Sequence, residues 1–183
     1  MTNIEKLKGK WTLDPAHSEF GFSVRHAGIS KVRGRFTDIA ASIDATEGIE
    51  GANVNAVAKA ASFDSGDANR DAHVVGPDFL DSEEFPELHF ESTSLKLLSI
   101  KDDGDFQLDG NLTIRDVTLP VSFEVELHGT AVDPFGNARA GLSGKTVINR
   151  KDFGLTWNAA LETGGVLVGD KVTIILELSF IKE

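Results

Sequence analysis

The amino-acid sequence predicts an all-β protein, a single eight-stranded antiparallel barrel, and three observations predict it. Apolar and polar residues alternate with a period of two in several segments, as strands with one buried and one exposed face require. Turn-forming sequences, such as residues 102–105 and 133–136, separate these segments. The 183 residues are 40% hydrophobic, which is enough for one core but leaves no long linker between two.

Five segments carry the clear alternation. In residues 172–180 the apolar side chains share one face, with Ile175 as the single exception. Residues 106–114 and 121–127 repeat the pattern, and residues 88–90 and 20–24 show it over a shorter length. If the apolar residues of these segments face the core, the polar residues between them face solvent, and we expect this of Glu124, Glu126, His128 and His89.

Three weaker candidates complete the predicted barrel: residues 32–43, 52–63 and 139–149. In the first, the apolar phase shifts between Phe36 and Ile39, as a β-bulge would require. Eight strands of about ten residues can close around side chains or one small ligand. Residues 67–82 break the pattern and predict a short helix and loop insertion. This insertion either lies across a barrel mouth or is a plain surface connection.

Charge and composition narrow the possible partners and the compartment. The net charge of −11 would repel a nucleic-acid backbone. The chain has no cysteine, which excludes disulfides and thiolate metal sites. Residues 1–10 are a charged N-terminal extension without an apolar run, so we expect residues 11–183 to form the barrel, without stable membrane insertion and in the cytoplasm.

Basic residues gather on one predicted hairpin, at Arg25, Lys31, Arg33 and Arg35. They could hold an anionic head group, or they could be a solvated edge that pairs with the many carboxylates. His26 continues the inward phase of Phe20, Phe22 and Val24, so it should point into the barrel. There it would either contact a ligand or hydrogen-bond to a core neighbour.

Residues 52–61 are rich in alanine, which is poor strand composition. Alanines that face the lumen would leave room for a ligand, although packing against a bulky neighbour explains them equally well. We expect Ala56 or Ala58 to face inward. The sequence contains no nucleophile elbow, zinc-protease motif, phosphate loop or dinucleotide fingerprint, and we expect no enzymatic activity.

Five segments, taken in order along the chain, resemble the recurring motifs of a known protein family. They are residues 11–18 (WTLDPAHS), 70–73 (RDAH), 78–90 with its Asp-Phe and Phe-Pro pairs, 110–114 (GNLTI) and 149–154 (NRKDFG). Together they resemble the YceI-like family of lipocalin-like polyisoprenoid-binding proteins, over nearly the whole chain from Trp11. The sequence departs from the family pattern at Val74, Leu80 and Asp116.

The resemblance implies a lipocalin-like barrel whose interior holds a polyprenyl lipid or quinone-type chain, with no cofactor, metal or established catalytic residue. It matches the family's recurring positions at His17, His26, Arg70, Asp71, His73, Phe79, Arg150 and Phe153. Phe20 and Phe22 join these as predicted ligand-binding residues. Arg70 and Asp71 could instead be a structural ion pair, and a homodimer is possible.

Three hypotheses follow from the sequence. The first is a protein that binds, and carries or stores, an isoprenoid lipid or quinone. The second is a metal-dependent or acid–base enzyme, which requires His17, His26, His73 and Asp71 to converge. The third is a barrel filled by its own side chains that serves as an interaction domain.

Overall fold

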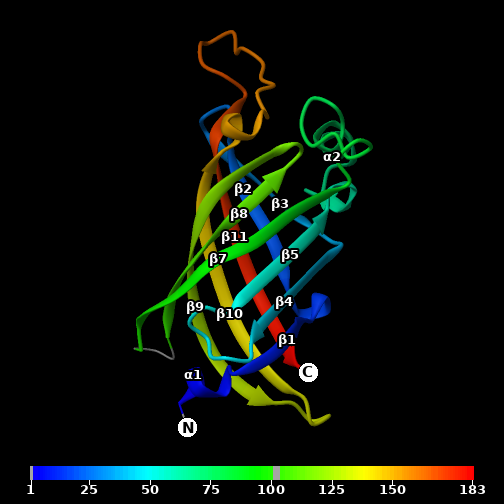
Figure 1. Ribbon diagram of the computed structural model, residues 1–183. Coiled ribbons are helices and arrows are strands. Elements are labelled where there is room, and N and C mark those ends of the chain that lie inside the picture. Colours follow the sequence, from blue (N-terminus) through cyan, green and yellow to red (C-terminus); the bar gives the residue numbers. More distant parts are fainter. Residues whose placement is uncertain (1, 101–103) are drawn as a thin grey trace.

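The computed structural model describes residues 2–100 and 104–183, most of which lie in antiparallel strands (Figure 1). The strands of the first half are β1 (Gly9–Leu13), β2 (Glu19–His26), β3 (Ser30–Phe36), β4 (Ile39–Ala45), β5 (Asn53–Lys59) and β6 (Phe63–Asp64). Those of the second half are β7 (Glu87–Ser99), β8 (Asp105–Ile114), β9 (Val117–Val132), β10 (Ala138–Asn149) and β11 (Val168–Lys182). The helices are α1 (Asn3–Lys6), α2 (Ala68–Val75) and the short 3-10 turns η1 (Pro15–His17), η2 (Ala60–Ser62) and η4 (Arg150–Phe153).

Eight of these strands close into a barrel. Their order is β1-β4-β5-β7-β8-β9-β10-β11, and pairing of β1 with β11 completes the circle. One edge of β11 pairs with β10. The other edge is long enough for two partners, β1 near Phe180 and β2 from Val168 to Glu177. β2, β3 and β6 therefore extend the wall beyond the closed part. The prediction of an eight-stranded antiparallel barrel is confirmed.

Two of the weaker strand candidates differ in detail from the prediction. Residues 32–43 are not one bulged strand but β3 and β4, which have different neighbours. The change of partner falls at Thr37 and Asp38, whose backbone groups bond to Ser62 (3.1 Å) and Lys59 (2.9 Å) rather than to a ladder strand. The segment 52–63 likewise ends its first strand at Lys59, and its end forms β6.

The side-chain phase within the strands is confirmed. All apolar positions of β8 that were predicted to face inward are buried, from Phe106 to Ile114. Glu124, Glu126 and His128 on β9 are exposed, as is His89 on β7. Ile175, the exception in the pattern of β11, lies on the outer face and is 37% exposed. Period-two alternation is therefore enough to assign the inner face of these strands.

Both chain termini lie at one end of the barrel, which we call the closed end (Figure 1). Trp11 is 2% exposed there, and its Nε1 donates a hydrogen bond to the carbonyl oxygen of Leu7 at 2.7 Å. Leu7 and Phe180 are buried beside it, and the remaining void is only about 10 Å³. Residues of the predicted N-terminal extension thus belong to the core and, at Gly9, to β1.

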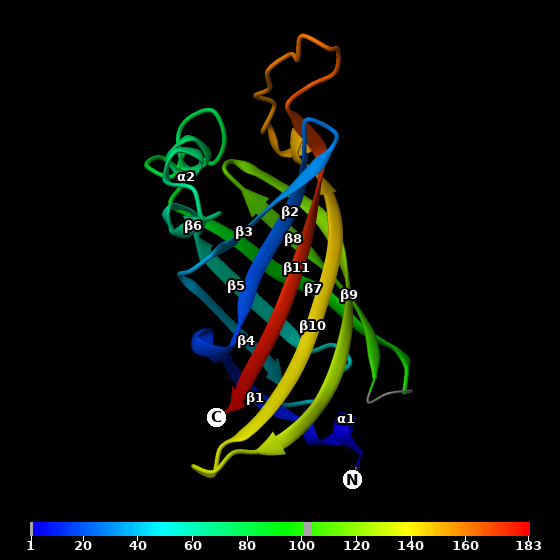
Figure 2. The same cartoon turned by 180° about the vertical axis from the view of Figure 1, so that it is seen from behind.

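The opposite end, which we call the open end, holds α2, the β2–β3 turn and the segment 154–167 (Figure 2). The predicted insertion at 67–82 contains α2, which begins because the side chain of Asp67 accepts a hydrogen bond from the backbone N of Arg70 at 3.0 Å. The helix ends at Gly76, and Leu80 bonds back to Val74. α2 therefore stands over one side of the open end rather than in the barrel wall.

Candidate functional site

The barrel encloses an apolar cavity of about 640 Å³, within the range of roughly 300–1,000 Å³ that is usual for small-molecule sites. It begins among exposed residues at the open end, such as His26 and Asn69, and continues inward to Phe180, which separates it from the Trp11 cluster. Its lining phenylalanines are Phe20, Phe22, Phe36, Phe63, Phe79, Phe90, Phe123 and Phe180.

Aromatic rings form one wall of the cavity. Phe22 stacks on Phe63 with ring centroids 5.1 Å apart, and Phe36 meets Phe63 edge to face at 5.8 Å. Gly34 makes this arrangement possible, because a Cβ at that position would lie 2.5 Å from the Cζ of Phe22. The wall is therefore a rigid apolar surface that was predicted only in part, through Phe20 and Phe22.

Small side chains form another part of the cavity wall. Ala56 and Ala58 on β5 both line the cavity, together with Ala41 on the neighbouring β4. Ala56 and Ala58 pair with Phe90 and Leu88 of β7, which also line it. The prediction that an alanine of this segment faces the lumen is confirmed, and the alanines widen the cavity between bulky residues.

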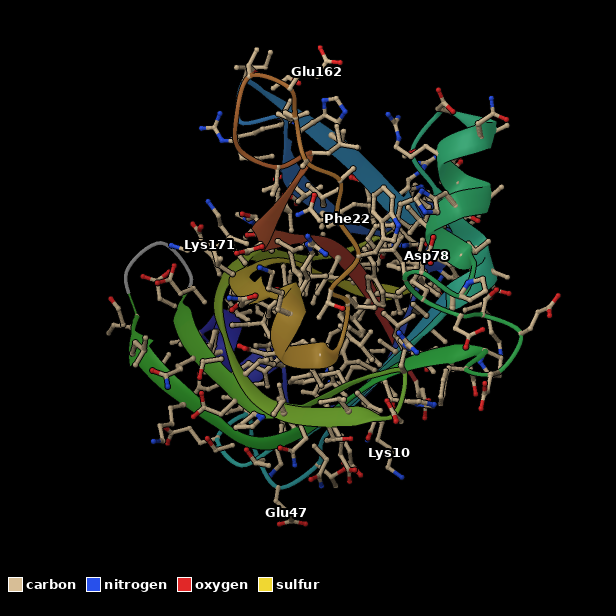
Figure 3. All side chains as sticks on the ribbon, turned by 90° about the horizontal axis from the view of Figure 1, so that it is seen from above. Lys10, Phe22, Glu47, Asp78, Glu162 and Lys171 are labelled. Carbon is tan, nitrogen blue, oxygen red and sulfur yellow. The ribbon has the colours of Figure 1, made fainter. Side chains whose placement is uncertain are left out.

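Three aromatic side chains from separate segments meet at the mouth. The ring of His73 on α2 lies 4.5 Å from Trp157 and 5.1 Å from Phe79, with edge-to-face geometry in both pairs. The Nε2 atom of His73 is 2.9 Å from an Oδ2 of Asp78. Seen from above, Phe22 lies inward of Asp78 and of Glu162 on the segment before β11 (Figure 3).

The polar lining of the cavity is basic or neutral. Its polar members are Arg25, His26, Asn69, Arg70, His73, His89 and Arg150, and no aspartate or glutamate of the described residues lines it. Arg70 donates from Nε to the hydroxyl of Ser65 at 2.7 Å and from Nη2 to its carbonyl at 2.9 Å. Asp71 accepts from the same hydroxyl at 2.5 Å. Arg70 and Asp71 therefore position α2 jointly through Ser65.

Arg150 is 3% exposed and organises the segment that carries Trp157. It donates to the carbonyl oxygens of Leu155 (2.6 Å), Trp157 (2.9 Å), Val168 (3.2 Å) and Gly169 (2.8 Å). Burial lowers the pKa of its guanidinium, with the distant carboxylate of Asp170 opposing that shift. Although Arg150 lines the cavity, these carbonyls occupy its donors, so its contribution is to hold the mouth in shape.

The structure brings seven of the ten predicted ligand-binding residues to the cavity: Phe20, Phe22, His26, Arg70, His73, Phe79 and Arg150. His17 is elsewhere, with its side chain 68% exposed and its Nδ1 2.7 Å from Asp14. Phe153 is a core residue, 2% exposed, and Asp71 bonds to Ser65. These three lie outside the lining and support the fold around it.

The prediction that His26 lies inside the barrel is wrong. His26 does share the inward phase of Phe22 and Val24. However, it is the last residue of β2, where the wall ends, and it is exposed. Its side chain is therefore at the rim of the cavity rather than within it.

The arrangement bears on the other two hypotheses. His17, His26, His73 and Asp71 do not converge, since their contacts are with separate partners at different places in the fold. Residues 2–100 and 104–183 contain no group of three or more metal-ligating side chains. A barrel filled by its own side chains does not fit a cavity of about 640 Å³.

None of the helices in the described part of the chain is long and apolar enough to cross a membrane.

Several lining residues were missed from the sequence. Phe90, Leu108, Leu112 and Phe123 were assigned to inner faces but were not proposed as site residues, although their phase could have identified them. Trp157 had no such signal, because it lies in an irregular segment without periodicity. Its position at the mouth depends on the Arg150 hydrogen bonds.

The fold and its large apolar cavity define a lipocalin-like barrel. Residues 11–180 match the family model of the YceI-like domain, and the chain belongs to this family. A UPF0312 protein of Shewanella oneidensis is 40% identical over 142 residues, which are 76% of this chain and 72% of that protein.

Two solved structures share the architecture. BcnA of Burkholderia cenocepacia superposes with a TM-score of 0.76 at 21% identity, covering 91% of this chain and 98% of that one. A polyisoprenoid binding domain from Saccharophagus degradans superposes with a TM-score of 0.71 at 12% identity, covering 94% and 98%. At these identities the likeness establishes the barrel fold.

Proposed function

We propose that this protein binds, and carries or stores, a long apolar isoprenoid-type molecule, a polyprenyl lipid or an isoprenoid quinone, inside the barrel. The observation that carries the proposal is the cavity of about 640 Å³ with its phenylalanine and alanine walls. The structural relative from Saccharophagus degradans, which is described as polyisoprenoid-binding, supports it. The proposed function is binding without catalysis; a cytoplasmic location and a homodimer stay predictions.

The binding free energy would come mainly from the chain of the ligand. Each buried methylene contributes about 0.8 kcal/mol, so one isoprene unit of five carbons contributes roughly 4 kcal/mol. Association costs between about 4 and 15 kcal/mol in lost freedom, and a few buried units offset that cost. The apolar walls discriminate little between chains of similar length, so polyprenols and quinones should compete for the cavity.

The polar groups at the mouth would orient the ligand. His26, Arg70 and His73 lie at the open end, whereas the deep lining near Phe123 and Phe180 is apolar. The Nη1 atom of Arg70 has no hydrogen-bond partner within the described residues. A polar or anionic head group would therefore lie at the mouth and the isoprenoid tail would run inward.

The test is to fill the cavity from one alanine. Ala56→Phe adds a ring to the inner face of β5, and we expect it to abolish uptake of a geranylgeranyl chain labelled with a nitrobenzoxadiazole dye, measured by fluorescence. Because an empty cavity accepts the extra volume, thermal unfolding should change little, whereas a packed core would lose about 1–3 kcal/mol.

Asn55→Phe is the matched control, because Asn55 is exposed on the outer face of the same strand. It should bind the probe as the unmodified protein does. Undiminished uptake by Ala56→Phe would contradict the proposal, as would a failure of the unmodified protein to bind the probe. Native mass spectrometry of gently purified protein would then identify the natural ligand by its mass.

A further inference from the structure

A row of unpaired cations lies on the outer wall of the barrel beside the mouth. In β2 and β3 the outward positions alternate with the inward positions Phe22 and Val24, and the register sets Arg25 opposite Lys31 and Ser23 opposite Arg33. Arg25 also borders the cavity at its rim, whereas Lys31 and Arg33 do not line it. Lys171 lies on the adjoining β11. We name Arg25, Lys31, Arg33 and Lys171 the basic face; all four are exposed, and none forms an ion pair within the described part of the chain.

The carboxylates near the basic face pair with other cations: Asp170, which precedes Lys171, has its Oδ1 3.3 Å from the Nζ of Lys151. Below the basic face on the same wall, Glu19 lies 3.8 Å from Arg35, and Glu124 is paired in register with Lys145. Glu162 is exposed on the segment that precedes β11, which stands at the top of the molecule in Figure 1. The chain has 29 acidic and 18 basic side chains, so four exposed cations without an ion pair in the described part of the chain run against the overall charge.

Apolar side chains are exposed on the same wall. Ile29, in the β2–β3 turn next to Arg25 and Lys31 of the basic face, is 86% exposed. Val147 and Ile175 point outward from β10 and β11 and are 54% and 37% exposed. This mixture of cations with separate apolar side chains is the composition of surfaces that rest on anionic lipid membranes.

The basic face adjoins the opening of the cavity. β2 ends at His26, which lines the cavity at its rim, and the turn with Ile29 follows directly. This turn stands at the open end of the barrel together with α2 (Figure 1). A flat partner that contacts Ile29 and the basic face would therefore lie next to the mouth.

We propose that the basic face and Ile29 dock the protein on an anionic lipid bilayer, so that the ligand passes between membrane and cavity beside the mouth. The cations would contact lipid phosphates while Ile29 enters the interface. A bilayer fits better than an acidic protein, because the apolar residues project singly from a convex wall and form no groove that a partner side chain could fill. The purpose of this docking rests on the proposed function, but the docking itself can be measured without ligand.

The test is sedimentation with vesicles of phosphatidylcholine mixed with phosphatidylglycerol. Each cation near an anionic surface strengthens binding about fivefold, so the double variant Lys31→Ala/Arg33→Ala should bind about 25-fold more weakly. Ile29→Ser should lose about tenfold through its apolar contact. Binding of the unmodified protein should fall with added salt and should be weak to phosphatidylcholine alone.

The matched control is Lys8→Ala/Lys96→Ala, which changes the net charge equally at two exposed positions away from the basic face, one just before β1 and one near the end of β7. It should bind within about twofold of the unmodified protein. An equal loss in both double variants, or no binding of the unmodified protein to anionic vesicles, would overturn the proposal; the latter is the result that an acidic protein partner predicts. Thermal unfolding of each variant verifies that its fold is intact.

The geranylgeranyl probe separates this proposal from the proposed function. Without vesicles, Lys31→Ala/Arg33→Ala should take up the probe as the unmodified protein does, because neither Lys31 nor Arg33 lines the cavity. If no variant binds the probe while the vesicle results hold, ligand binding is wrong and docking stands. If the probe binds but the expected vesicle results are not obtained, docking is wrong and ligand binding stands.

Discussion

The two tryptophans of the chain lie at opposite ends of the barrel and have opposite surroundings. Trp11 in β1 is 2% exposed, and its indole donor is satisfied by the carbonyl of Leu7. Trp157 lies in the irregular segment at the open end, is half-buried, and lines the cavity against His73 and Phe79. One tryptophan fills its end of the barrel, and the other borders an empty space.

The polar groups of the two ends differ in the same way. At the closed end Arg139 binds Asp14 at 2.8 Å and Asp133 at 2.7 Å, so the charges satisfy one another. At the open end the cations of the basic face have no such partners within the described residues. The comparison teaches that the charged side chains of the closed end pair with one another, whereas the cations of the basic face beside the open end form no such pairs within the described residues.

The tryptophans offer the largest test of this comparison. Trp11→Ala should lower the free energy of unfolding by about 3–5 kcal/mol, because it leaves a cavity and an unpaired carbonyl at Leu7. Trp157→Ala should cost at most about 1 kcal/mol of stability but weaken probe binding about fivefold. Denaturant unfolding and fluorescence titration measure the two effects. Similar stability losses in both variants would break the comparison.

Two glycines give a smaller effect of the same kind. A Cβ at Gly110 would lie 2.5 Å from the backbone oxygen of Glu91, whereas one at Gly34 would meet the ring of Phe22, which borders the cavity. Gly110→Ala should therefore cost about 1–3 kcal/mol of stability. Gly34→Ala should cost less and should instead displace Phe22 and reduce uptake of the probe. A larger stability loss for Gly34→Ala would show that Phe22 has no space to move into.

The sequence was sufficient for the parts of the molecule that local periodicity encodes. Alternation identified the inner faces of β8, β9 and β11. Composition predicted that Ala56 or Ala58 faces the lumen, and both line the cavity. The sequence could not show where the segment 32–43 changes its partner strands. That change depends on backbone hydrogen bonds to Ser62 and Lys59, which form only in the folded protein.

The sequence predicted residues in the walls of the cavity correctly, but it did not predict the arrangement of residues at the mouth. The phase that gave Phe20 and Phe22 also placed His26, but periodicity does not show where a wall ends, so the exposure of His26 was missed. Trp157 reaches the mouth through carbonyl bonds to the buried Arg150, an arrangement without a local sequence signal. His17 shows the converse: its match to a family position did not place it at the cavity.

The charge cluster at the closed end should make stability depend on pH. Hydrogen bonds from Arg139 lower the pKa of Asp133 and of Asp14. A carboxyl whose pKa is lowered by folding stabilises the protein above its unfolded pKa of about 3.9, and this stabilisation is lost as the pH falls through the folded value. Arg139→Met should therefore lower Tm at pH 7, and the difference from the unmodified protein should shrink progressively below about pH 4.

Arg70→Met is the control at the open end, because Arg70 donates to Ser65 and forms no ion pair within the described residues. A hydrogen bond from the backbone N of Arg70 is the main cause that lowers the pKa of Asp67, and the charge of the Arg70 side chain is a lesser one, so the Tm difference should change less with pH than that of Arg139→Met. Thermal unfolding followed by circular dichroism measures both variants. A constant difference for Arg139→Met would mean that packing of its side chain, rather than its charge, holds the closed end.

The smallest expected effect is that of the Glu162 carboxylate on vesicle binding at the open end. Glu162 is exposed on the segment that precedes β11 at the open end, so its carboxylate should oppose an anionic bilayer that approaches there. Glu162→Gln should strengthen binding to phosphatidylglycerol vesicles by about fivefold or less, since the loop stands at the edge of the contact. Glu47→Gln makes the same change in charge at the exposed turn between β4 and β5, far from the mouth, and should leave binding unchanged. An equal gain in both variants would trace the effect to net charge and would remove Glu162 from the docking surface.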